Sequence, residues 1–306
     1  MLGQFRQILS SPREALFKAN PWLAPRAEEL ARLFALPNAV PDAAAIASRR
    51  AGSLARLRLG ARAWNEWAGV MRALAAPLAA DPATQRLWSY AAATDFAGAS
   101  AGLPYDLAGL TFPGALDLSD VSFAATAWFS ASTFTGDAIF RDTRFEQGAN
   151  FERAVFNARA DFDRASFARS GEFREARFLG PASFRGAEFV KDAWFRGGAF
   201  AALDMEGASF GGEAGLGAVQ YGGPANFSKV SFGDNAGFEA ARFADVARFD
   251  DAKFARNARF EQATFGRDPS FDRARFLGKI LFEGISVPEG GSPVHRTIAE
   301  LARRLG

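Results

Sequence analysis

Phenylalanine recurs along the middle of this chain at steps that alternate between five and six residues. The unbroken part of the series comprises Phe129, Phe134, Phe140, Phe145, Phe151, Phe156, Phe162, Phe167, Phe173, Phe178, Phe184, Phe189, Phe195 and Phe200. The same phase extends back to Leu107 and forward to Val287, with one irregularity at Met205, where two steps of five follow each other. Because the chain holds 32 Phe but only 3 Tyr and 6 Trp, we expect these residues to fill one repeated core position.

Neither a helix nor a flat strand accommodates this series. Five residues rotate an α-helix by about 140° from the starting direction, so successive Phe side chains would lie on two separate stripes. Pro181, Pro224 and Pro269 would also interrupt such a helix. In a flat strand, an odd step places successive Phe side chains on opposite faces. The series therefore predicts a chain that turns a corner every five or six residues and points each Phe inward.

The residues around each Phe agree with such a wound chain. The residue two positions earlier is usually Ala, as at Ala149 and Ala160, and period two places it on the same inward side. Polar residues follow the Phe, as in Glu152-Arg153, and should face water. The segment 149–167, ANFERAVFNARADFDRASF, resembles the A-x-F-x-x units of the pentapeptide-repeat family.

This resemblance covers residues 107–287 and implies a mainly β fold, a right-handed quadrilateral β-helix with four units in each coil. The family's usual unit has five residues, whereas every second unit here has one more. The extra residue leaves the turn types open. Four units per coil predict between eight and nine coils, each of which would rest only on its neighbours.

Residues 1–95 are expected to form an α-helical domain ahead of the solenoid. Ser11-Pro12-Arg13-Glu14 fits a capping box with Pro at the first helical position. A further start is predicted at Asp81-Pro82. The later helices are expected near residues 25–36, 42–59, 61–79 and 82–93.

Two features of this helical domain leave alternatives open. Trp64, Trp67 and Met71 begin one apolar stripe, which would pack on neighbouring helices or on the first coil, or would line a groove for a partner. Arginines gather in residues 49–62, either as a solvated helix face or as a surface for an anionic partner.

A short helix is predicted over residues 292–305, after Ser292-Pro293. Ile298, Leu301 and Leu305 follow helical spacing there. This helix would cap the last coil or pair with its copy. Some pentapeptide-repeat proteins dimerise through their C-terminal ends, so the resemblance gives weight to a homodimer.

Candidate chemistry is sparse. The chain has no Cys and a single His, His295, which excludes disulfides and a multi-histidine metal site. The Gly-rich stretch 211–223 lacks a phosphate-loop sequence and keeps the repeat phase through Leu216 and Tyr221. We expect no catalytic residues, no metal and no cofactor. No apolar run is long enough for a membrane span and no signal peptide is evident, so we expect a cytoplasmic protein.

These features predict a non-catalytic protein-binding or scaffolding module whose partner is a protein of unknown identity. The resemblance offers an alternative, because some family members bind DNA gyrase by imitating duplex DNA. Such imitation needs an acidic surface, whereas residues 121–282 hold 21 acidic and 21 basic residues. Nucleic-acid binding is not expected at a net charge of +2. The distribution of charge over the four faces should separate these hypotheses.

Overall fold

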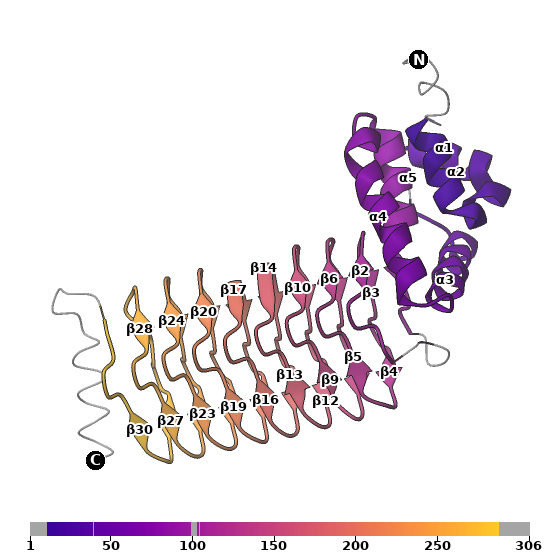
Figure 1. Cartoon of the computed structure of the whole chain (residues 1–306). Helices are drawn as coiled ribbons and strands as arrows, with labels where there is room; N and C mark the ends of the chain where they lie inside the picture. Colours follow the sequence, from indigo (N-terminus) through magenta and orange to yellow (C-terminus); the bar gives the residue numbers. More distant parts are fainter. Residues whose placement is uncertain (1–10, 39, 99–102, 104, 288–306) are drawn as a thin grey trace, which may run out of the picture. The chain divides into compact units, whose positions relative to one another are not determined.

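A computed structural model describes residues 11–38, 40–98, 103 and 105–287. The chain divides into two compact units, one of residues 1–95 with 111–116 and one of residues 96–110 with 117–306. The first unit is mainly helical and the second is a β-solenoid (Figure 1).

The helical unit contains five α-helices and one 3₁₀-helix in its described part: α1 (Pro12–Ala19), η1 (Pro21–Arg26), α2 (Ala27–Ala35), α3 (Ala43–Leu57), α4 (Ala61–Leu78) and α5 (Pro82–Ala92). The predicted caps are confirmed, since Ser11 Oγ accepts a hydrogen bond from Glu14 N and Asp81 from Thr84 N. The 3₁₀-helix was not predicted. It begins at Pro21 and contains Pro25, whose missing N–H and ring oppose a regular α-helix there.

Residues 111–116 belong with the helices because polar contacts hold them there. Trp64 Nε1 donates to Thr111 O at 2.8 Å, and Thr111 N donates to Asn65 Oδ1 at 2.9 Å. Thr94 N also donates to Ala115 O. The short strands β2 (Thr111–Phe112) and β3 (Leu116–Asp117) begin in this stretch, and β1 (Thr94–Asp95) pairs with β3.

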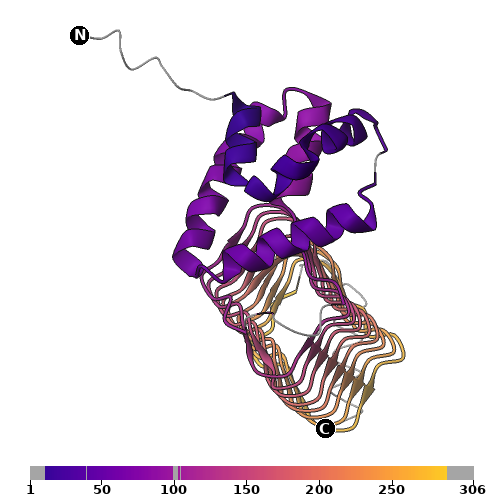
Figure 2. The same ribbon diagram turned by 90° about the vertical axis from the view of Figure 1, so that its right-hand side faces the viewer.

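The solenoid is a four-sided tube of parallel strands, and Figure 2 views it down the tube axis. Most paired residues lie one coil, or 22 positions, apart, as do Val155 and Arg177. The sides, named faces A to D in chain order, follow from these pairings.

Face A continues from β3 through β7 (Ala138–Ile139), β11 (Ala160–Asp161), the ends of β14 (Arg177–Ser183) and β17 (Ala199–Asp204), β21 (Ala225–Asn226) and β25 (Ala247–Arg248). Face B consists of β4 (Ser122–Phe123), β8 (Arg144–Phe145), β12 (Ser166–Phe167), β15 (Glu188–Phe189), β18 (Ser209–Phe210), β22 (Ser231–Phe232), β26 (Lys253–Phe254) and β29 (Arg275–Phe276).

Face C consists of β5 (Ala127–Trp128), β9 (Ala149–Asn150), β13 (Gly171–Glu172), β16 (Ala193–Trp194), β19 (Ala214–Gly215), β23 (Ala236–Gly237), β27 (Ala258–Arg259) and β30 (Ile280–Leu281). Face D consists of β6 (Thr133–Phe134), β10 (Val155–Phe156), the starts of β14 and β17, β20 (Gln220–Tyr221), β24 (Arg242–Phe243) and β28 (Thr264–Phe265).

The interior is filled by the repeated aromatic residues. The predicted core positions from Phe129 to Phe200 are all at most 3% exposed. Rings in adjacent coils stack nearly parallel, with centroids 4.5 Å apart for Phe156 and Phe178. Rings on the opposite faces A and C meet edge to face, as Phe151 meets Phe162 at 89°. Each buried ring contributes about 1.5–3 kcal/mol to folding.

The two unit lengths make two kinds of corner. In five-residue units the chain turns tightly, with Phe162 O accepting from Ala165 N at 3.0 Å and Arg164 in the left-handed region at φ 56°. This geometry is a type II turn, which usually places Gly at that position. The extra residue of the six-residue units widens the alternate corners to three residues. The extra residue thus changes the corners and leaves the four-sided section intact.

Candidate interaction surface

Polar side chains border the core residues of face A and order its backbone. Asp161 Oδ1 accepts a hydrogen bond from Asp163 N at 3.1 Å, across the intervening Phe162. Asp204 and Asn226 make the same contact with the backbone N–H two residues on. This Asx-turn favours Asp or Asn immediately before the core residue.

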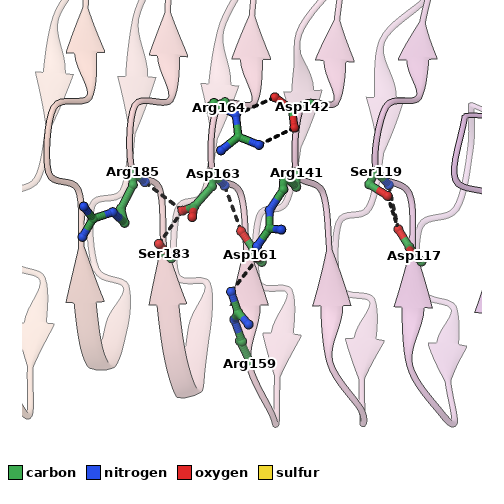
Figure 3. A network of polar contacts seen from close by, with 10 residues as sticks. All are labelled: Asp117, Ser119, Arg141, Asp142, Arg159, Asp161, Asp163, Arg164, Ser183 and Arg185. Carbon is green, nitrogen blue, oxygen red and sulfur yellow. Dashed lines mark hydrogen bonds and ion pairs between the residues drawn. The ribbon is translucent and has the colours of Figure 1, made fainter.

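Asp161 is the most enclosed carboxylate of the face, with a side chain only 2% exposed. Its Oδ2 receives Arg141 at 2.6 Å from the preceding coil and Arg159 at 2.7 Å from the adjoining corner (Figure 3). Two guanidinium groups compensate the buried charge, which would otherwise be strongly unfavourable.

Ion pairs also join the tight corners of successive coils. Arg164 holds Asp142 through two hydrogen bonds, at 2.8 and 2.6 Å (Figure 3). Arg273 holds Asp251 in the same way, at 2.8 Å for both bonds. Each guanidinium group lowers the pKa of its partner carboxyl below the ordinary value, mainly through these hydrogen bonds. Stacked like charges would repel at this spacing, so opposite charges stabilise the corner.

Further contacts extend the polar face along the coils. Asp163 accepts hydrogen bonds from Ser183 Oγ and from Arg185 N (Figure 3). Arg185 then binds Asp204 and Glu206, each at 2.8 Å. Lys229 continues the chain of contacts to Glu206 at 2.8 Å. Face A therefore presents a continuous array of paired acids and bases.

The other faces differ in charge. Along face D, between residues 132 and 266, the outward positions flanking the described core residues carry only two charges, Arg177 and Arg242. Face C carries both acidic and basic side chains, and Arg153 pairs with Glu175 at 2.9 Å. Acids on the described faces are thus interspersed with bases, and none of the four faces is wholly acidic.

The apolar stripe of the helical unit lies inside that unit. Trp64 and Met71 are fully buried and Trp67 is 7% exposed. The side chain of Asn20 lies among them, since its Oδ1 accepts from Trp67 Nε1 and its Nδ2 donates to Leu16 O. These three side chains therefore pack against residues of the helical unit.

The arginines of residues 49–62 are also largely engaged, so the expectation of a solvated face is wrong for several of them. Arg49 and Arg50 both bind Asp95, at 2.9 and 3.1 Å. The Arg56 guanidinium lies 4.0 Å from the Trp67 ring and donates to Ala19 O at the end of α1, and burial lowers its pKa to about 10. Pairing over such distances in sequence was not predictable from a charge pattern alone.

Only part of the remaining predicted sites lies within the described residues. Residues 211–223 form a normal part of the solenoid, with Leu216 and Tyr221 buried. Ile298, Leu301 and Leu305 lie outside the described residues. Within the described ranges, no acidic or histidine side chains converge as metal ligands would, and no helix has the length and apolarity that crossing a bilayer requires.

The comparisons with known proteins agree with this architecture. A family model described as pentapeptide repeats (9 copies) matches residues 107–155, 151–198 and 238–284. No curated protein and no solved structure matches the chain. The unmatched stretch between 198 and 238 contains the irregular step at Met205. With the stacked four-sided coils and the buried Phe ladders, the match shows that this chain is a pentapeptide-repeat protein.

Proposed function

We propose that the protein is a non-catalytic scaffold that binds a protein partner through face A. The observation that supports this most is the continuous ion-paired array from Arg141 to Lys229 on a tube filled with stacked rings. A rigid surface loses little conformational entropy on binding, and an ordered array of charges favours one partner over others.

The paired charges also bear on catalysis and on DNA imitation. A catalytic carboxylate needs a pocket that perturbs its pKa, whereas Asp142 and Asp251 lie at open corners beside arginines. A DNA mimic needs a surface of unpaired negative charge, and the acids of face A are largely neutralised by Arg141, Arg164 and Arg185. Both observations favour the scaffold.

The test is affinity capture from the native host with the full chain and two matched variants. Arg164→Glu reverses a paired corner charge on face A, and Arg153→Glu reverses a paired charge at the opposite tight corner. Both residues have φ 56°. We expect a partner that is retained by Arg153→Glu and lost with Arg164→Glu. Equal capture by both variants, or no partner at all, would contradict the proposal.

A homodimer through residues 292–305 remains a second, independent part of the proposal. Its support is the apolar spacing of Ile298, Leu301 and Leu305 in the sequence. Sedimentation of the full chain should give a dimer that Leu301→Glu converts to a monomer. A monomer at all concentrations would leave capping of the last coil as the role of this segment.

A further inference from the structure

One corner between faces D and A lacks a residue that its neighbours have. The preceding coil turns this corner with Leu179-Gly180-Pro181 and the following coil with Gly222-Gly223-Pro224, whereas the coil between them uses only Ala201-Ala202. The register accordingly shifts between Phe178 and Pro181, where Pro181 pairs with Ala202. β14 and β17 run through this corner without a break.

The shortened corner leaves a hollow of about 320 Å³ between the two longer ones. Pro181 and Pro224 line it from the coils on either side and serve as its walls, and Ala202 and Leu203 line it from the shortened coil between them. Its rim is polar and includes Arg159, Asp204 and Asn226. We call this hollow, lined by these residues, the notch.

The corner segments that form the notch are uncharged. None of the three corner segments 179–181, 201–202 and 222–224 contains a charged residue. Leu179, two residues before Pro181 in the same corner, is 51% exposed. The rim charges are already paired, Arg159 with Asp161 and Asp204 with Arg185. An apolar centre with a satisfied polar rim is the usual anatomy of a binding hot spot.

The dimensions of the notch favour a flat side chain. Its walls belong to coils on either side of the shortened one, so they are about 9–10 Å apart, two strand spacings. A planar ring placed between them would lie about 4.7 Å from each wall. The buried rings directly beneath stack at a similar distance, 4.5 Å between Phe178 and Phe200.

We propose that the notch receives an aromatic side chain of a protein partner, stacked between Pro181 and Pro224. The inference rests on the proposed binding role and adds an anchor point to it. The nearly uncharged face D adjoins the notch and supplies area around the anchor. An uncharged ring fits because every nearby charge has a partner, so a cationic or anionic side chain would be desolvated without compensation.

The test titrates the full chain with N-acetyl-L-tryptophanamide and follows alanine and leucine methyl resonances by NMR. We expect shifts at Leu179, Ala202 and Leu203 with a Kd of about millimolar order, and none with N-acetyl-L-lysinamide. Two variants perturb the notch in different ways. Insertion of one Gly between Ala201 and Ala202 restores a three-residue corner, and Leu179→Glu places a charge on its edge.

Both variants should weaken the tryptophanamide shifts by at least about tenfold. Leu277→Glu is the matched control, since Leu277 also follows a core Phe, is 67% exposed and lies at the opposite wide corner. It should leave the titration unchanged. Equal binding by the insertion variant, or no shifts at the notch up to about 20 mM, would overturn the inference. This titration needs no partner, so its failure is distinct from failure of the capture experiment.

Discussion

Tyr221 offers a sharp test of the packed interior, because it occupies a core position held by Phe in the coils above and below. Its side chain is 1% exposed, and its ring stacks on Phe243 at 4.5 Å and on Phe200 at 5.8 Å. The buried Oη makes no hydrogen bond to another described residue. Met205 and Leu216 are non-aromatic core residues of the same coil, so this coil contains fewer aromatic rings than the adjacent coils.

We predict that Tyr221→Phe stabilises the protein. An unsatisfied buried hydroxyl costs about 1–3 kcal/mol, which the substitution removes. Loss of one oxygen leaves a small cavity that costs roughly 0.3 kcal/mol. The net gain should be about 1–2 kcal/mol, measured as a higher urea midpoint at unchanged slope by circular dichroism.

The matched control is Phe178→Tyr on the same ladder. Phe178 stacks at 4.5 Å on both Phe156 and Phe200, so an added hydroxyl would be buried between tightly packed rings. This variant should lose about 1–3 kcal/mol. A lower midpoint for Tyr221→Phe would show that the hydroxyl is satisfied in solution and would refute the reasoning.

Three further predictions concern the corners and the ion pairs. At tight corners, Ala240→Gly should stabilise and Gly207→Ala should destabilise by about 1 kcal/mol each in urea unfolding, because both positions have positive φ, 55° and 71°. Equal midpoints for these two variants would mean that backbone strain at the corners is negligible. Asp161→Asn keeps an acceptor for the Asx-turn and should cost less stability than Asp161→Ala, which we expect to lose about 1–3 kcal/mol because Arg141 and Arg159 are half-exposed and remain solvated. Identical losses of stability for Asp161→Asn and Asp161→Ala would show that the charge of Asp161, and not its Asx-turn, stabilises the fold. The arginine partners lower the pKa values of Asp142 and Asp251. Each ion pair therefore stabilises the folded protein fully above pH 3.8, the ordinary pKa of Asp, and this stabilisation is lost as the pH falls below that value. Thermal midpoints measured from pH 6 downward should therefore decline in acid, and less steeply for Asp251→Asn; an unchanged acid profile for that variant would exclude the pair as a contributor.

The repeat itself was readable from the sequence because one core position dominates the composition. A series of core residues spaced alternately by five and six positions requires a chain that turns corners. The Ala that usually lies two residues before the Phe indicates which side faces inward, as the buried Ala160 shows. The capping box at Ser11 was equally local, since its two hydrogen bonds span three residues. Local rules and a single repeated contact therefore predict much of this fold.

The surface was less predictable, because its partners are one coil apart and not adjacent in sequence. Arg164 meets Asp142 only after the chain has completed a full turn. The signal for the Asx-turns was present, as Asp or Asn immediately before a core residue at Asp161, Asp204 and Asn226. The short step at Met205 was visible too, but its consequence, a notch beside Pro181, depends on the lengths of the two neighbouring corners.

The helical unit shows a different limit. The spacing of Trp64, Trp67 and Met71 indicated an apolar stripe but not what covers it. Burial of the stripe follows from tertiary contacts such as Trp64 with Thr111. Such contacts bring together residues from distant parts of the chain, and no periodicity of one helix encodes them.

The most direct test of the scaffold account is hydrogen exchange of the full chain with and without its captured partner. We expect slowed exchange at the backbone amides around Asp161, Arg164 and Arg185 on face A, with face C unchanged. Protection confined to the helices between Pro12 and Ala92, with the solenoid unaffected, would contradict the account.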